Sequence, residues 1–152
     1  MFRRRCRSRM TTNRNTMVKI SIDYEGGLHC VATHGPSGDR LATDAPVDNE
    51  GKGEAFSPTD LVAAALGACI ATTMAIVAGR KGIELSGSSV DVGKEMSAEP
   101  PRKISRLKVK VVVPLAADHP VREVLEAAAR RCPVARSLDP GVDVPLEFVW
   151  SG

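Results

Sequence analysis

Alternating apolar and polar residues predict several β-strands in this chain. Residues 18–24 (VKISIDY) and 28–34 (LHCVATH) flank a turn that contains Gly26 and Gly27, so we expect them to form an antiparallel hairpin. The other predicted strands are a short one at residues 40–43 and longer ones at residues 88–99, 104–114 and 144–150.

A long helix is predicted over residues 58–80, because its start carries strong capping signals. Ser57 can cap the helix, Pro58 suits its first position, and Asp60 stands where a capping box places an acceptor. Gly82 is expected to close the helix.

Two further helical segments are predicted near the end of the chain. Apolar residues recur at helical spacing in residues 118–131, and a short helical turn is expected after Pro133. Because the strands group together instead of alternating with helices, the predicted fold class is α+β with antiparallel sheets.

The long helix contains 18 consecutive residues without a charge, residues 61–78. This length approaches that of a membrane span. However, seven of the 18 residues are alanine and two are threonine, and no Trp or Tyr belt flanks the segment. We therefore expect a helix buried in a protein core rather than in a membrane, and its burial on all sides indicates that a partner subunit covers it.

The length and the charge of the chain limit the classes of function that it can have. The 152 residues are 43% hydrophobic and 26% charged, which fits one globular domain. Six arginines and no acidic residue lie in residues 1–16, so the net charge of +3 becomes −3 without this segment. A nucleic-acid-binding domain usually carries its basic residues on the folded body, so we expect no nucleic-acid partner.

Residues 1–16 are predicted to be a disordered basic tail, and residues 17–152 the folded domain. The tail has too few apolar residues to pack. A start codon assigned too far upstream, with Met17 as the true start, explains it more simply than an organelle transit peptide does, because it lacks an apolar helical face. Without an apolar signal segment, the expected location is the cytoplasm.

Four cysteines are the main candidates for chemistry, at positions 6, 30, 69 and 132, and without a close pair they are expected to be free thiols. Cys69 lies in the middle of the long helix, where a small core residue is the simplest interpretation. Cys132 precedes Pro133 and can cap a helix, where the helix dipole favours a thiolate. His29, Cys30 and His34 lack a fourth ligand nearby, so no metal site is predicted.

Two motifs carry a family resemblance. Residues 57–69 (SPTDLVAAALGAC) are followed by residues 132–138 (CPVARSL), and the two cysteines are 63 positions apart. Together with the order of the predicted elements from Met17 onward, the motifs resemble the OsmC/Ohr family, the osmotically inducible and organic hydroperoxide resistance proteins. The resemblance implies an OsmC-like fold, in which an intertwined homodimer buries the long central helices.

The resemblance also implies a thiol-dependent peroxidase, in which Cys69 attacks an organic hydroperoxide and becomes a sulfenic acid that Cys132 resolves. An external dithiol, such as a lipoyl dithiol, would restore both thiols, and no bound cofactor is expected. The alternative is a non-catalytic protein of the same fold that binds an apolar small molecule at the dimer interface.

The sequence departs from the family at the residues that activate the thiolate. The better-known peroxidases have a glutamate ten positions before the first cysteine, and here Thr59 stands in that place with Asp60 after it. Asp60 is a candidate for this role, although its place in the capping box already gives it a structural explanation, which we favour. Arg40 is the candidate for the activating arginine, because no other arginine lies between Met17 and the long helix.

Overall fold

The computed structural model describes residues 17–152, and these divide into two compact units, one ending at Thr43 and the other running from Asp44 to Gly152. Each unit is described by itself. The predicted disordered tail, residues 1–16, lies outside the described residues.

The first unit is a three-stranded sheet in the order β1-β2-β3, with β1 at Ile20–Gly26, β2 at His29–His34 and β3 at Arg40–Asp44. The predicted hairpin is confirmed, because β1 and β2 pair antiparallel. On β1, Ile20, Ile22 and Tyr24 alternate on one face and are each at least 60% exposed. This sheet therefore presents an apolar face to solvent.

The second unit contains a mixed three-stranded sheet in the order β4-β5-β6, formed by Ser89–Met96, Ile104–Val113 and Leu146–Trp150. β4 and β5 pair antiparallel, whereas β6 pairs parallel to β5. The prediction of antiparallel sheets alone was wrong here. The chain crosses over through two helices between β5 and β6, and such a crossover allows parallel pairing.

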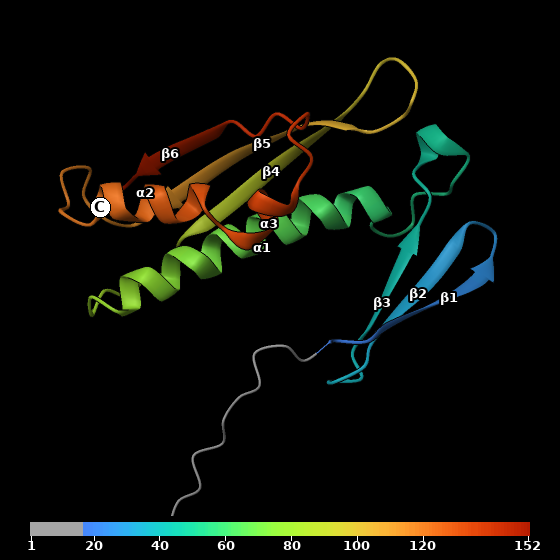
Figure 1. The fold of residues 1–152 in the computed structure, drawn as a ribbon, viewed down its shortest axis with the longest axis horizontal. Helices are drawn as coiled ribbons and strands as arrows, with labels where there is room; N and C mark the ends of the chain where they lie inside the picture. Colours follow the sequence, from blue (N-terminus) through green and yellow to red (C-terminus); the bar gives the residue numbers. More distant parts are fainter. Residues whose placement is uncertain (1–16) are drawn as a thin grey trace, which may run out of the picture. The chain divides into compact units, whose positions relative to one another are not determined.

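Helix α1, Pro58–Gly79, runs along this sheet and is the central helix of the unit (Figure 1). The predicted capping box is confirmed: the Ser57 hydroxyl accepts from the Asp60 N–H, and the Asp60 carboxylate accepts from the Ser57 N–H. By length and composition α1 also qualifies as a membrane span, with a mean hydropathy of 2.2. Its contacts with β4 and with a second helix are those of a core helix in this unit.

Only part of the surface of α1 is buried within the chain. Leu66, Ile70 and Met74 are at most 2% exposed and pack in the core. The opposite side of the helix is exposed and consists mainly of small residues, namely Ala64, Ala65, Ala68, Thr72, Ala75 and Ile76. The burial on every side that the sequence predicted is therefore not supplied by this chain alone.

Helices α2, Arg122–Arg130, and α3, Pro133–Ser137, follow β5 and precede the 146–150 strand. Helix α2 starts four residues later than predicted. His119 precedes Pro120, and a residue before proline is disfavoured in the helical region, so the 118–121 segment forms turns. The core joins α1 and α2 to the inner face of the sheet, where Leu107, Val109, Val111, Val113, Leu125 and Ala129 are at most 1% exposed.

Candidate functional site

Cys69 lies midway along α1 with its thiol half-buried. Its position places it at the edge of the core, where it packs against buried residues, next to the exposed side of the helix. The Sγ atom of Cys69 lies 4.0 Å from Oγ1 of Thr73, one helical turn later. A partly buried thiol at such an edge can meet a substrate without unfolding of the helix.

Cys132 is the N-cap of α3 and is fully buried. Pro133 occupies the first position of the helix, as predicted, and the Ala135 N–H donates to Cys132 Sγ at 3.4 Å. The cap holds the sulfur in a fixed place at the start of α3.

The two cysteines lie in the same region of the core, although they are 63 positions apart in the sequence. Cys132 belongs to the buried core, Cys69 packs against that core, and helices α1 and α3 contact each other. Burial raises the pKa of Cys132, and hydrogen bonding and charge interaction with Cys69 raise it further. The amides of Ala135 and Val134 act in the opposite direction. The sequence predicted that the helix N-terminus would favour a Cys132 thiolate; the amides do act that way, but burial outweighs them. Cys132 therefore holds its proton beside Cys69.

Asp60 is engaged by groups on both sides of the start of α1. Its Oδ2 atom accepts from the Ser57 N–H at 2.8 Å, and its Oδ1 atom forms an ion pair with Lys94 Nζ at 2.6 Å. Lys94 lowers the pKa of Asp60, assisted by the hydrogen bonds from Ser57 and opposed by partial burial. In this chain the carboxylate is thus held by a structural network, and a role in thiolate activation stays a prediction.

Lys94 is the residue of this network that the sequence analysis missed. It lies on β4, its side chain is only 17% exposed, and its Nζ also donates to Thr59 Oγ1 at 2.7 Å. The signal was present in the strand pattern, because Lys94 alternates with Val90 and Val92 and so shares their helix-facing side. A lysine on the apolar side of a strand indicates a buried partner for its charge.

Arg40, the other predicted activating residue, begins β3 in the first unit and is exposed. The thiols belong to the second unit. The role of Arg40 therefore stays a prediction.

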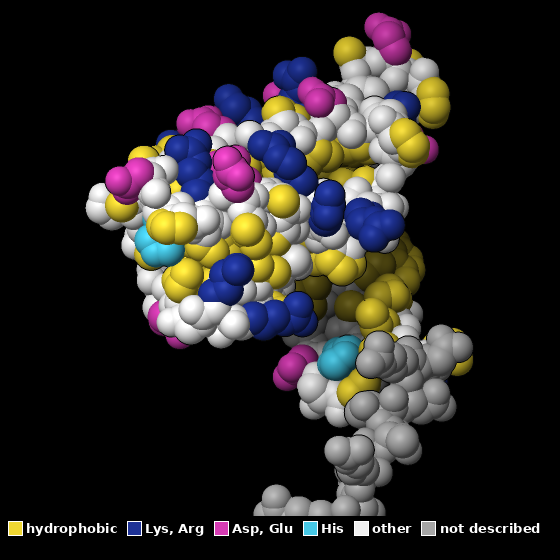
Figure 2. All heavy atoms as spheres, turned by 60° about the vertical axis from the view of Figure 1, so that its left-hand side comes forward, with side chains coloured by type: hydrophobic (Ala, Val, Ile, Leu, Met, Phe, Trp, Pro, Cys, Tyr) yellow, Lys and Arg dark blue, Asp and Glu magenta, His cyan; other side chains and the backbone are white. Residues whose placement is uncertain are grey.

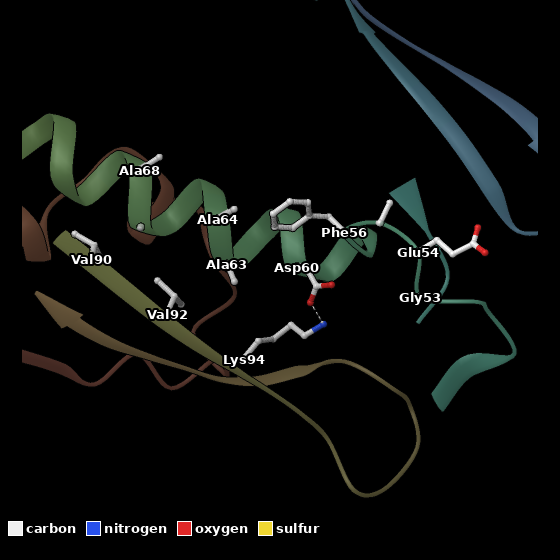
Figure 3. A pocket seen from close by; sticks show the side chains of 12 residues that line it. Gly53, Glu54, Phe56, Asp60, Ala63, Ala64, Ala68, Val90, Val92 and Lys94 are labelled. Atoms are coloured by element: carbon white, nitrogen blue, oxygen red, sulfur yellow. Dashed lines mark ion pairs between the residues drawn. The ribbon is translucent and has the colours of Figure 1, made fainter. Parts of the chain in front are cut away.

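A cavity of about 730 Å³ lies between the first half of α1, the 53–56 segment and β4. Its walls are mostly small and apolar, and neither Cys69 nor Cys132 lines it. Figure 3 shows Val90, Val92 and Lys94 projecting from β4 toward α1, with the ion pair to Asp60 at one end. Gly67 allows α1 to lie close to β4 at this side of the cavity, because a Cβ on residue 67 would lie only 3.1 Å from Val92 Cγ2.

Within the part of the chain that the structure describes, no group of three or more metal-binding side chains is present. Of the residues considered for a metal, His34 instead contacts Ser37, with Nδ1 and Oγ 2.7 Å apart. Ser37 in turn donates to the Asp39 carboxylate at 2.8 Å, so this cluster is part of an exposed turn.

Known proteins resemble this chain in both sequence and fold. Residues 51–147 match the sequence model of the family described as OsmC-like protein. A structure from Psychrobacter arcticus 273-4, of a protein named for osmotic stress induction and a detoxification response, shares 36% identity over 88% of this chain and 97% of that one, with a TM-score of 0.82. No curated protein sequence matches the chain.

Two more distant structures share the fold. The organic hydroperoxide resistance protein OsmC from Legionella pneumophila is 22% identical over 88% of this chain and 97% of that one, with a TM-score of 0.71. An organic hydroperoxide resistance protein from Elizabethkingia anophelis is 14% identical over 91% and 99% of the two chains, with a TM-score of 0.74.

Proposed function

The chain belongs to the OsmC-like protein family, and from this membership we propose that it is a thiol-dependent peroxidase that reduces organic hydroperoxides. The observation that carries the proposal is that a half-buried Cys69 packs against the same core that holds the buried Cys132. Two free thiols in one region of the core, of which one is exposed enough to meet a substrate, match the needs of a reaction that ends in a disulfide.

In the proposed reaction, the Cys69 thiolate attacks the terminal oxygen of the hydroperoxide. An S–O bond forms as the O–O bond breaks, and the alkoxide takes up a proton and leaves as the alcohol. Cys69 is thereby oxidised by two electrons to a sulfenic acid. The Cys132 thiol then attacks the Cys69 sulfur, water leaves, and a disulfide forms. An external dithiol reduces this disulfide by exchange and is itself oxidised.

The proposed substrate is an organic hydroperoxide, because Cys69 packs against the hydrophobic core. The proposed reductant is a small dithiol of the lipoyl type, and no bound cofactor is required by the reaction. We place this activity in the cytoplasm. Lysine and arginine side chains are mixed with acidic ones on the face shown in Figure 2, which supports a function without nucleic acid or a membrane.

We also propose that the protein acts as an intertwined homodimer. The exposed side of α1 supports this, because it contains Ile76 at 57% exposure among alanines that permit close approach of another helix. The exposed apolar face of β1, with Ile20, Ile22 and Tyr24, supports it independently.

The proposal is tested by stopped-flow oxidation of the reduced protein with cumene hydroperoxide and with hydrogen peroxide. We expect faster reaction with the organic peroxide, loss of the reaction in Cys69→Ser, and accumulation of sulfenic acid without disulfide in Cys132→Ser. Oxidation no faster than that of free cysteine, and equal in the parent and both variants, would contradict the peroxidase.

A second candidate function is binding of an apolar small molecule, and the cavity lined by Ala63, Gly67 and Val92 favours it. Its volume of about 730 Å³ lies in the range of small-molecule sites. Because neither cysteine lines this cavity, ligand binding there would survive the double substitution of Cys69 and Cys132 by serine. Loss of binding in that double variant would exclude this cavity as an independent site.

A further inference from the structure

Two adjacent threonines of α1 use their hydroxyl groups differently. Thr72 Oγ1 donates to the carbonyl oxygens of Ala68, at 2.9 Å, and Cys69, at 3.2 Å. This is the usual bond of a helical threonine to the preceding turn. The Thr73 hydroxyl instead lies beside the Cys69 sulfur, with Oγ1 and Sγ 4.0 Å apart.

The arrangement of the two side chains explains this difference. Thr72 already occupies the Cys69 carbonyl, and Thr73 is four residues after Cys69, so its side chain lies directly over that turn. Thr73 is half-buried, so water competes weakly for its hydroxyl. A hydroxyl can rotate to donate to an anionic sulfur or to accept from a neutral thiol.

We propose that Thr73 is a catalytic residue of the peroxidase, whose hydroxyl donates a hydrogen bond to the Cys69 thiolate. The inference rests on the proposed function for its role in turnover, but the hydrogen bond itself does not. It supplies a stabilising donor within the same helix, which has no cation of its own between Asp60 and Arg80. Bonds to charged groups are stronger than those between neutral groups, so the ionised sulfur gains more from this contact than the thiol does.

The titratable groups on the packed elements leave this role open to Thr73. On α3, Cys132 interacts with Cys69 but is held protonated by burial. Helix α1 has no charged residue between Asp60 and Arg80. On the other packed elements, Lys94 of β4 pairs with Asp60, and on α2 Arg122 pairs with Glu126 while Arg130 lies over Phe148. The remaining charged residues of β4, β5, α2 and α3 are exposed, namely Asp91, Glu95, Arg106, Lys108, Lys110, Glu123, Arg131 and Arg136.

The test measures the rate of iodoacetamide alkylation of Cys69 against pH, followed by mass spectrometry, in the full-length protein. Thr73→Val keeps the shape and removes the hydroxyl, and Thr73→Ser retains a hydroxyl. Thr72→Val is the matched control, because it removes a neighbouring hydroxyl that bonds only to carbonyls. The loss of one hydrogen bond worth about 1 kcal/mol predicts an alkylation rate about fivefold lower at pH 7 in Thr73→Val. The midpoint of its pH profile should move to higher pH, with the parent rate kept in Thr72→Val and largely restored in Thr73→Ser.

Equal rates and midpoints in the parent and Thr73→Val, with both folded by circular dichroism, would overturn the proposal. So would an equal loss in Thr72→Val, since that outcome indicates a change in the helix rather than a specific donor. Failure of the peroxidase itself is distinguished by the readout. If the parent does not reduce hydroperoxides but Thr73→Val still shifts the alkylation profile, the hydrogen bond is supported and the proposed peroxidase activity is contradicted.

Discussion

Lys94 Nζ lies 2.6 Å from Asp60 Oδ1 and thereby joins strand β4 to the first turn of helix α1. The same ammonium group donates to Thr59 and, at 3.4 Å, to Ser57, so the start of the helix is held by several bonds. The helix that carries Cys69 is therefore fixed to the sheet at a point nine residues before the thiol.

Asp60→Asn should reduce stability and its dependence on pH. The folded pKa of Asp60 is lowered, chiefly by Lys94, so its contribution is present above the unfolded pKa and is lost as the pH falls through the folded value. The Asp60 side chain is 41% exposed, so solvent screening limits the loss at neutral pH to about 0.5–1 kcal/mol. Urea unfolding at pH 7 and near pH 3 measures both effects.

The control for this prediction is Asp118→Asn, which changes an exposed acid in a loop. It should leave the unfolding midpoint within experimental error at both values of pH. If Asp60→Asn matches this control at neutral pH, the ion pair contributes nothing to stability.

A second prediction concerns the order in which the thiols ionise. Because burial raises the pKa of Cys132, its thiol should remain protonated at a pH at which an ordinary cysteine, with a pKa of about 8.5, is half ionised. The thiolate absorbance in the ultraviolet, recorded in a variant that retains Cys132 as its sole cysteine, measures this titration. Thiolate formation at or below the ordinary pH would show that the helix N-terminus outweighs burial.

The same shift predicts a loss of stability in alkali. A thiol with a raised folded pKa contributes stability that is fully present below the unfolded pKa and is lost as the pH rises toward the folded value. Cys132→Ser should therefore flatten the decline in unfolding free energy above about pH 8.5. Serine retains an oxygen acceptor for the N–H of Ala135, so the cap itself is preserved.

The sequence predicted the parts of this molecule that depend on local signals. The capping box of Ser57 and Asp60, the β1–β2 hairpin and the cap at Cys132 are each determined by residues close together in the chain. The parallel pairing of β6 was not predictable in this way, because it depends on how α2 and α3 return the chain to the sheet. The Lys94 ion pair was missed for the same reason, since its partner is 34 positions away.

A fourth prediction tests the homodimer through the exposed side of α1. Ile76→Glu places a charge on this side, where Ile76 is 57% exposed in the single chain, and a buried unpaired charge is strongly unfavourable. The parent should sediment as a dimer and Ile76→Glu as a monomer or a much weaker dimer. Val124→Glu, on α2 with 42% exposure, is the control and should remain dimeric; a monomeric parent would contradict the proposal.

The last prediction separates the two candidate functions by filling the cavity beside β4. Ala68 lines this cavity, whereas Ala65 is exposed on the same helix and does not. Ala68→Phe should therefore weaken the binding of a neutral apolar probe, phenylnaphthylamine, by about tenfold, and Ala65→Phe should leave it unchanged. The fluorescence of the bound probe measures the affinity, and sedimentation shows whether both variants keep the assembly of the parent. If Ala68→Phe loses probe binding but consumes cumene hydroperoxide at the parent rate, the cavity is separate from the peroxidase site. Loss of both activities in Ala68→Phe alone would mean that hydroperoxides reach Cys69 through this cavity, although the thiol itself does not line it.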